Sequence, residues 1–420
     1  MNEIDLRYDE GSFKLRFDDR LNVLSTDPQN ETPLSDVEIG DALDAPIESP
    51  ALDELVNTDD SVLIVVSDAT RATGSAQIVN LLVRRLIQSG VSPSKMGIIF
   101  ATGIHRPVTP EEKVELLTQF IVQRVRTLQH DPYDPGGLVS LGTTDRGIPI
   151  QLNRALTEFS RIILLGGINF HYFAGFTGGR KSICPGLASA QTIESTHMLA
   201  LDFQRGGRRA GVGVGLLDGN AVHEECERVA QIVRPAFGIY TVVDQVKRVV
   251  KVYCGDWRVA HRVACEAFLK EHSVAIPDKR DLVVASCGGF PHDINLIQAH
   301  KALEMASYGC KDGGSIILLA ACRDGFGRPD FLKWFDGADS AALEKRLFDH
   351  YEVNGQTAWS LLIKAERFHL QLISNFNQAD VSRMRMNAAT SLEQALKRVA
   401  DYRSGFIMPR GANLLPRLDR

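Results

Sequence analysis

The sequence lacks several features that mark other classes of protein. No apolar run approaches the ~20 residues of a membrane-spanning helix, and the acidic start MNEIDLRYDEG lacks the basic flank and apolar core of a secretory signal. The 7 cysteines are scattered without a C-x-x-C pair, which favours reduced thiols over a disulfide framework or a zinc ribbon. A formal net charge of -5 argues against a general nucleic-acid binder, which is usually basic. We therefore expect a cytoplasmic protein that binds neither a membrane nor nucleic acid.

Strands and helices alternate in the first part of the chain. Residues 62–66 and 96–101 are continuous apolar runs, typical of strands in a parallel sheet that is covered on both faces. A helical pattern at 76–90 lies between them, which is the βαβ arrangement of an open α/β sheet. Residues 25–45, which come earlier, are rich in turn formers and acids, so we expect an irregular connection there.

A second alternation follows the polar pause IPDKR. Strand patterns at 281–286 and 315–321 enclose a helical pattern at 294–309. The chain has 420 residues, which is enough for two domains. We therefore expect an α/β fold in which residues 1–275 and 276–420 form two domains, each with a mostly parallel sheet flanked by helices.

Polar side chains follow the predicted strands of the first part. Asp68 and Arg71 come after the first strand, His105 after the second, and His171 after the apolar run 162–165. Ligands of open α/β sheets bind at the carboxyl ends of the strands. A single histidine at a strand end is more commonly structural, but two of them can act as an acid and a base on either side of one substrate.

The densest cluster of chemically useful residues lies just before a predicted helix at 190–198. Gly178 and Gly179 precede Arg180 and Lys181, and glycines beside cations before a helix favour an anionic ligand. Lys181 has three interpretations. It is the lysine of an imperfect P-loop in which Arg180 replaces the second glycine, a reactive amine beside another cation, or an ordinary surface lysine.

Other candidates lie on predicted helices. His197 has no second His or Cys at i+3 or i+4, so a metal there would take most of its ligands from elsewhere, such as a cofactor. His223 begins the run His-Glu-Glu-Cys, which we interpret as a solvated helix face rather than a metal site. Gln298 and Lys301 share one helix face, which is either an ordinary exposed face or a place to hold a carboxylate.

Four blocks, taken together and in order, resemble the nickel-dependent lactate racemase family of 2-hydroxyacid racemases and epimerases. The blocks are SDATRATG at 67–74, ATGIHR at 101–106, the long stretch from NFHYFAGFTGGRKSICPG to TIESTH at 169–197, and DINLIQAHKA at 293–302. The third block is long and specific to the family, and the other three are short.

The resemblance implies a nickel-pincer nucleotide, which is a pyridinium-3,5-bisthiocarboxylic acid mononucleotide that carries nickel. It implies covalent attachment through Lys181, nickel ligation by His197 alone among the protein's residues, and maturation by cofactor-synthesis enzymes. The other residues that we assign to cofactor binding are Asp68, Thr70, Arg71, Gly178, Gly179 and Arg180.

The resemblance also implies a redox-neutral racemisation or epimerisation of a small 2-hydroxy acid. His105 or His171 takes the hydroxyl proton while the C2 hydride moves to the pyridinium ring, and the hydride then returns to the other face of the keto acid. Arg71, Gln298 and Lys301 match residues that hold the substrate. The implied site lies in a cleft between two domains, and we allow for a homodimer.

One position departs from the family pattern. The family's lactate enzymes carry an aromatic residue before the matching glutamine, whereas this chain has Ile297. Lactate is therefore in question as the substrate, and a longer, aromatic or sugar-derived 2-hydroxy acid is an alternative. Two other functions stay open: a P-loop-like phosphotransferase built on residues 175–182, and a non-catalytic protein that binds small carboxylates.

Overall fold

The computed structural model describes residues 2–26, 32–337, 339–399 and 401–419. The chain forms two compact α/β units, which we call unit 1 and unit 2. Unit 1 comprises Met1–Pro28, Leu201–Arg208 and Lys270–Arg420, and unit 2 comprises Gln29–Ala200 and Arg209–Leu269. The expectation of two α/β units with largely parallel sheets is confirmed.

Unit 2 is built on a six-stranded sheet with the strand order β13-β12-β9-β4-β5-β6. Neighbouring strands from β12 to β6 are parallel, and β13 at one edge is antiparallel to β12. The predicted strands at 62–66, 96–101 and 162–165 are confirmed. The sheet strands are β4 (Val62–Ser67), β5 (Met96–Ala101), β6 (Arg126–Leu128), β9 (Arg161–Gly167), β12 (Phe237–Val243) and β13 (Val249–Gly255), and shorter pairs are β7 (Leu138–Thr143) with β8 (Pro149–Asn153) and β10 (Phe170–His171) with β11 (Gly175–Phe176).

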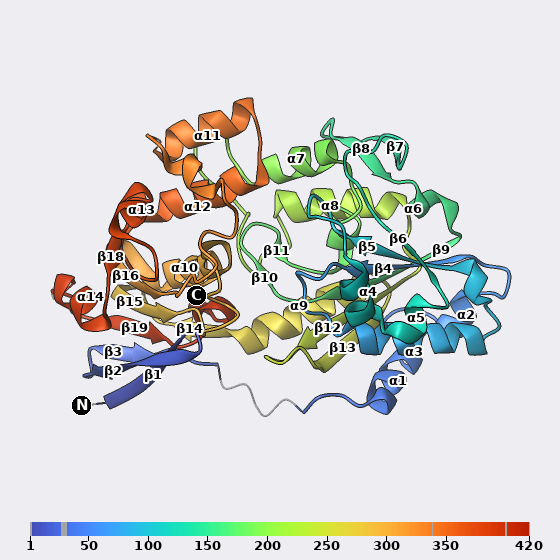
Figure 1. Ribbon diagram of the computed structural model, residues 1–420, viewed down its shortest axis with the longest axis horizontal. Coiled ribbons are helices and arrows are strands. Elements are labelled where there is room, and N and C mark those ends of the chain that lie inside the picture. The colour runs from blue at the N-terminus through green and yellow to red at the C-terminus, as the bar shows by residue number, and fades with distance from the viewer. Residues whose placement is uncertain (1, 27–31, 338, 400, 420) are drawn as a thin grey trace. The chain divides into compact units, whose positions relative to one another are not determined.

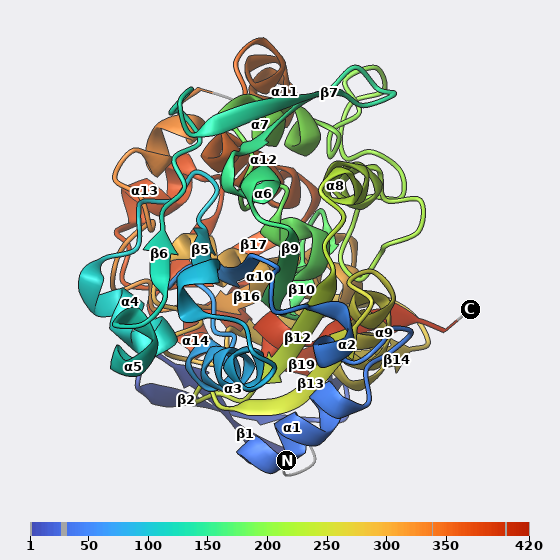
Figure 2. The same cartoon turned by 90° about the vertical axis from the view of Figure 1, so that its right-hand side faces the viewer.

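Helices cover both faces of this sheet. Helices α1 and α3 pack on one face, and Figure 2 shows them side by side. Ile78, Leu82 and Leu86 of α3 recur every four residues and are buried, as expected for an amphipathic helix. The other face carries the 3-10 helix η2, which contacts β4, β9 and α8. The helices are α1 (Asp36–Asp44), α2 (Leu52–Leu55), α3 (Ser75–Gln88), η1 (Pro93–Lys95), α4 (Pro110–Leu117), α5 (Gln119–Val122), α6 (Ala155–Glu158), η2 (Gly179–Ser182), α7 (Ala190–Met198), α8 (Ala221–Ile232) and α9 (Val259–His272).

Helix α1 corrects the expectation of an irregular connection at 25–45. Ser35 and Glu38 form a capping box, in which the Ser35 hydroxyl accepts from the Glu38 backbone N at 3.3 Å and the Glu38 carboxylate accepts from the Ser35 backbone N at 2.8 Å. Ile39 and Leu43 are fully buried. A short amphipathic helix thus lies within a segment of turn-forming composition, of which residues 27–31 fall outside the described part.

Unit 1 contains a second six-stranded sheet, with the strand order β18-β17-β16-β15-β19-β3. Each neighbouring pair in it is parallel. Its strands are β3 (Leu21–Val23), β15 (Arg280–Ser286), β16 (Cys310–Leu319), β17 (His369–Ile373), β18 (Asn387–Ala389) and β19 (Gly405–Met408), and two further pairs are β1 (Asn2–Tyr8) with β2 (Gly11–Phe17) and β14 (Ser273–Ile276) with β20 (Leu415–Leu418).

The N-terminal strands belong to unit 1, whereas the expected division placed them in a domain of residues 1–275. Strand β3 pairs with β19 at the edge of the sheet. The hairpin of β1 and β2 buries Leu6 and Leu15 against Leu282 and Ile317 in the core of unit 1. Alternating residues reveal a hairpin, but they carry no information about which distant sheet the hairpin covers.

Helices α10 and α12 cover one face of the unit 1 sheet, and α14 and the β1–β2 hairpin cover the other (Figure 1). Helix α10 confirms the helix expected at 294–309, and Asn295 caps it by accepting from the Gln298 backbone N at 3.0 Å. No helix in the described part of the chain is long and apolar enough to cross a membrane. The helices are α10 (Leu296–Gly309), η3 (Phe331–Phe335), α11 (Ser340–Asp349), α12 (Val353–Arg367), α13 (Gln378–Arg383), α14 (Leu392–Arg398) and η4 (Gly411–Asn413).

Candidate active site

Three loops that carry predicted site residues leave the same edge of the unit 2 sheet. Strands β4, β5 and β9 are parallel and adjacent, so their carboxyl ends lie together. Asp68 follows β4, His105 follows β5, and His171 follows β9 in the short strand β10. The expected placement of these residues at strand carboxyl ends is confirmed, at the edge where open α/β sheets bind ligands.

His105 is held in position by Asp68. The Asp68 Oδ2 lies 2.7 Å from the His105 Nδ1, and the His105 side chain is 44% exposed. The other oxygen, Oδ1, accepts from the backbone N and the hydroxyl of Thr70 at 2.9 and 2.5 Å. Burial alone would raise the pKa of Asp68, but the hydrogen bond and charge of His105 lower it below its usual value. An ionised Asp68 fixes the proton of His105 on Nδ1 and leaves Nε2 open to a ligand.

His171 and Lys181 meet in unit 2. The His171 Nε2 lies 3.2 Å from the Lys181 Nζ, and its Nδ1 accepts from the Ala174 backbone N at 3.3 Å. Burial lowers the pKa of His171 well below its usual value and lowers the pKa of Lys181 to about 7. The positive charge of Arg71 acts in the same direction on both groups. A neutral imidazole beside an amine that loses its proton near pH 7 suits proton transfer and nucleophilic attack.

Phe173 lies among these groups and is absent from the residues that we expected at the site. Its ring centroid lies 4.4 Å from that of His171 and 4.9 Å from that of His197, and the Lys181 Nζ lies 5.3 Å from it. From the sequence alone, a phenylalanine in an apolar stretch is expected to be a residue of the hydrophobic core. Its place inside the block at 169–197 is the one signal that could have identified it.

His197 is buried on helix α7, which is the helix expected at 190–198. Its Nδ1 lies 2.8 Å from the Ile193 carbonyl oxygen, so Nδ1 carries the proton and donates to that oxygen. Burial lowers the pKa of His197 to about 3, which keeps the ring neutral. The lone pair of the ring is therefore on Nε2, and a metal ion could bind it there.

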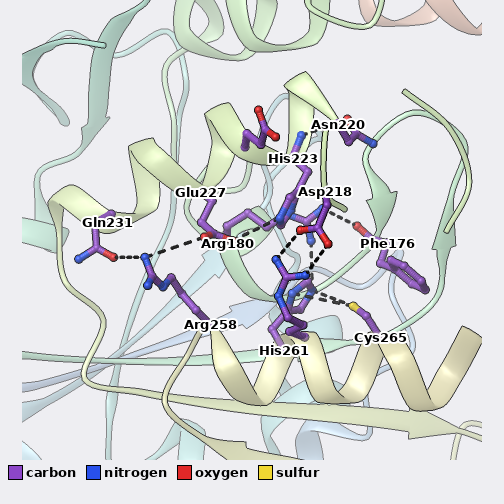
Figure 3. Close-up of polar contacts among 12 residues, drawn as sticks. Phe176, Arg180, Asp218, Asn220, His223, Glu227, Gln231, Arg258, His261 and Cys265 are labelled. Atoms are coloured by element: carbon purple, nitrogen blue, oxygen red, sulfur yellow. Dashed lines mark hydrogen bonds and ion pairs between the residues drawn. The ribbon is translucent and has the colours of Figure 1, made fainter. Parts of the chain in front are cut away.

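Arg180, which we assigned to cofactor binding, points into the protein interior (Figure 3). Its guanidinium donates to the carbonyl oxygens of Ala174 and Phe176 at 2.6 and 3.1 Å, and one Nη lies 3.1 Å from the His261 Nε2. The residue is only 1% exposed. These contacts make Arg180 an organiser of the loop that carries Lys181.

Gly178 and Gly179 are required by the same close packing. Both have a positive φ, of 75° and 57°. A Cβ at Gly179 would lie 2.6 Å from the His261 ring, and one at Gly178 would lie 3.0 Å from Ile168. The loop can lie this close to its neighbours because these positions have no side chain.

Gln298 and Lys301 lie in the first turns of α10, in unit 1. The Lys301 Nζ donates to the Gln298 Oε1 at 2.7 Å, so the two side chains share a helix face as expected. The amino-terminal end of a helix favours negative charge. An ammonium group and an amide at this end suit a carboxylate ligand.

The run that starts at His223 is not the solvated helix face that we expected. His223, Glu225 and Cys226 are buried, because α8 packs against both η2 and α7. The Glu225 carboxylate pairs with Arg146 and Arg228 at 3.1 and 2.8 Å. Across the residues that the structure describes, no group of three or more His, Cys, Asp and Glu side chains is arranged to hold a metal ion.

Comparison with known proteins identifies the family. A model described as the lactate racemase N-terminal domain matches residues 8–207, and one described as the lactate racemase C-terminal domain matches residues 276–406. The lactate racemase of Lactiplantibacillus plantarum is 31% identical over 413 residues, which is 95% of each chain. The lactate racemase of Thermoanaerobacterium thermosaccharolyticum is 32% identical over 294 residues, covering 70% of this chain and 67% of that protein.

Solved structures agree with these matches. The lactate racemase apoprotein from Thermoanaerobacterium thermosaccharolyticum has a TM-score of 0.90 at 27% identity, and the match covers 99% of this chain and 100% of that one. A protein from Thermotoga maritima has a TM-score of 0.68 at 20% identity, covering 92% and 99%, and supports the fold alone. This chain belongs to the lactate racemase family, and it is a racemase-type isomerase.

Proposed function

We propose that this chain interconverts the stereoisomers of a 2-hydroxy acid, either lactate or a larger relative, with a nickel-pincer nucleotide as its cofactor. The observation that carries the proposal is the 3.2 Å contact between the amine of Lys181 and the ring of His171. The lactate racemases that resemble this chain support a hydroxy acid as the substrate.

The side chains fit such a cofactor. An amine with a pKa of about 7 is a competent nucleophile at neutral pH, so Lys181 suits covalent attachment. His197 stays neutral and keeps a lone pair on Nε2, which a nickel ion requires of an imidazole ligand. When bound, the cofactor would accept and return the C2 hydride of the substrate. Cofactor-synthesis enzymes would be maturation partners, and the other residues proposed to bind or position the group are Asp68, Thr70, Arg71, Gly178, Gly179 and Arg180.

His105 and His171 would exchange the hydroxyl proton of the substrate. Asp68 holds the His105 proton on Nδ1, so the exposed Nε2 can accept the hydroxyl proton, and the carboxylate then stabilises the imidazolium. His171 is the second group proposed to exchange this proton, and burial keeps its ring neutral. Two bases are needed because the hydroxyl groups of the two enantiomers point in different directions.

The substrate carboxylate would be held by Arg71, Gln298 and Lys301. Two cations offset the cost of removing a carboxylate from water. The Gln298 amide oxygen accepts from the Lys301 ammonium, which fixes the direction of that charge.

The alternative functions have less support. Gly175 lies in β11 and residues 179–182 form a 3-10 helix, so this segment does not form the backbone cradle of a P-loop. A phosphotransferase is therefore not favoured. Membership of a racemase family also argues against a protein that only binds small carboxylates.

Racemisation of enantiopure acids tests the proposal. Holoenzyme produced together with the cofactor-synthesis enzymes and nickel is incubated with each enantiomer of lactate and of larger 2-hydroxy acids, and the products are resolved by chiral chromatography. We expect both enantiomers of a substrate to converge on one mixture. If protein with the attached cofactor leaves every acid unchanged, the proposal fails.

A further inference from the structure

Three phenylalanines follow the carboxyl ends of three neighbouring strands of unit 1. Phe290 follows β15, Phe326 follows β16 and Phe376 follows β17, and these strands are parallel neighbours. The rings of Phe326 and Phe376 stack with their centroids 4.4 Å apart and their planes 16° apart. Ligands of open α/β sheets bind at this edge. We call these three residues the aromatic cluster.

The aromatic cluster lies beside the N-terminus of α10, the helix that carries the proposed carboxylate-binding residues. The Leu296 backbone N donates to the Gly325 carbonyl oxygen at 3.1 Å. A Cβ at Gly327 would lie 2.9 Å from the Asn295 side chain, so Gly327 is in close contact with the cap of α10. Both neighbours of Phe326 therefore pack on the first turn of α10, which fixes the ring near that end of the helix.

The cluster is open to a ligand. Phe290 is 44% exposed, and Phe326 and Phe376 are partly exposed. Ile297, in the first turn of α10, is also partly exposed and adds apolar surface. Accessible rings near the N-terminus of a helix that carries an ammonium group and an amide suit a ligand with both an aromatic ring and a carboxylate.

The cation that contacts Phe290 does not favour a second carboxylate on that ligand. The Arg323 guanidinium lies 4.0 Å from the centroid of the Phe290 ring. It already pairs with Asp9 and Glu10, at 3.3 and 3.1 Å. These two carboxylates compensate the cation and would repel a second negative group on the substrate.

We infer that the preferred substrate is a 2-hydroxy acid with an aryl side chain, of which 3-phenyllactate is the simplest probe. This inference rests on the proposed function and specifies its substrate class. The carboxylate would be held at Gln298 and Lys301, and the aryl ring would stack on Phe326 and Phe376. Ring pairs favour such offset arrangements, which add to the gain from burying apolar area.

Holoenzyme kinetics with enantiopure lactate, 3-phenyllactate and malate test the inference. We expect kcat/KM for phenyllactate to exceed that for lactate by about tenfold or more. Phe326→Leu keeps an apolar side chain but removes the ring face, so it should lower the phenyllactate-to-lactate ratio of kcat/KM by about tenfold, mainly through KM. Saturation-transfer NMR gives a second measurement, because the ring protons of phenyllactate should receive less saturation from this variant than from the wild type.

Phe348→Leu is the matched control. Phe348 is 59% exposed on α11 and packs against Phe203 with ring centroids 5.0 Å apart. This substitution therefore removes one ring of another aromatic pair of unit 1. We expect it to leave the ratio unchanged. A wild-type preference for lactate or for malate overturns the inference and leaves the proposed function in place, as does an unchanged ratio in folded Phe326→Leu. Failure to racemise any acid contradicts the proposed function instead.

Discussion

The amine of Lys181 lies 3.2 Å from the Nε2 of His171, whose Nδ1 accepts a backbone hydrogen bond from Ala174. The backbone donor places the proton of the neutral ring on Nε2, which can then donate to the lone pair of an unprotonated amine. Burial lowers the pKa of Lys181 to about 7, so this unprotonated state is well populated at neutral pH. An ordinary exposed lysine reaches the same state only near pH 10.4.

Replacement of Lys181 should abolish covalent attachment of the cofactor. Intact-mass spectrometry of protein produced with the cofactor-synthesis enzymes should show an adduct on the wild type and none on Lys181→Ala. Lys95→Ala is the control, because Lys95 forms a partly exposed pair with Asp59 on unit 2 and should keep the adduct. An adduct on Lys181→Ala would show that the cofactor is attached to a residue other than Lys181.

The reactivity of the Lys181 amine should depend on pH with a midpoint near 7 in the apoprotein. The lowered pKa means that the neutral amine dominates above this pH, so acylation by a small reagent should rise through pH 7 and then level off. Peptide mass spectrometry can follow it, with Lys95 as the internal reference.

The same experiment tests the influence of Arg71 on Lys181. Its positive charge disfavours the ammonium form, so Arg71→Ala should move the midpoint to higher pH. Arg84→Ala, an exposed substitution on α3, should not move it. A midpoint near 10 in the wild type would contradict the buried environment of the amine.

Some features of this site could be predicted from the sequence, and others depend on tertiary packing. Apolar strands followed by Asp68, His105 and His171 correctly predicted that these residues share one sheet edge, because parallel neighbours bring their carboxyl ends together. The direction of the Arg180 side chain could not be predicted, because it depends on carbonyl groups of its own loop and on His261, 81 residues away. The position of Phe173 likewise follows from the folding of β10 and β11.

Removal of the Asp68 carboxylate should impair the proton transfer assigned to His105. Asp68→Asn loses the charge that fixes the tautomer and stabilises the imidazolium, so kcat should fall by roughly 10²–10⁴-fold. The loss in kcat/KM should be equal in the two directions, since enantiomers have equal free energies. Asp59→Asn, whose side chain is fully exposed, is the control. A fall of less than about threefold in correctly folded Asp68→Asn would assign the acid–base role to other groups.

His197→Ala should separate nickel binding from cofactor attachment. The lone pair on Nε2 is the proposed protein ligand of nickel, whereas Lys181 would hold the organic part of the cofactor. We expect the variant to keep the covalent adduct in its mass spectrum but to lose most of its nickel when measured by elemental analysis. His350→Ala, at an exposed histidine, should retain both. Full nickel content in His197→Ala would require a different metal ligand.

A buried ion cluster in unit 1 should contribute strongly to stability. The Glu304 carboxylate is 1% exposed and lies 2.6 Å from an Arg208 Nη and 2.5 Å from the Lys364 Nζ. Glu304→Gln removes the charge between two buried or partly buried cations, so the free energy of unfolding should fall by about 3–5 kcal/mol. Denaturant unfolding measures this, and Glu393→Gln is the control, because its pair with Lys397 is exposed on α14 and should contribute little.

The loss of stability caused by Glu304→Gln should become smaller as the pH falls. Burial would raise the pKa of Glu304, but the charges of Arg208 and Lys364 lower it overall, far below its usual value. A carboxylate with a lowered pKa stabilises the fold above its unfolded pKa of ~4.3, and this contribution is lost as the pH falls towards the folded value. The stability difference between wild type and variant should therefore be full at pH 7 and shrink below pH ~4. A difference that stays constant from pH 7 to pH 3 would mean that the loss arises from packing rather than from the charge.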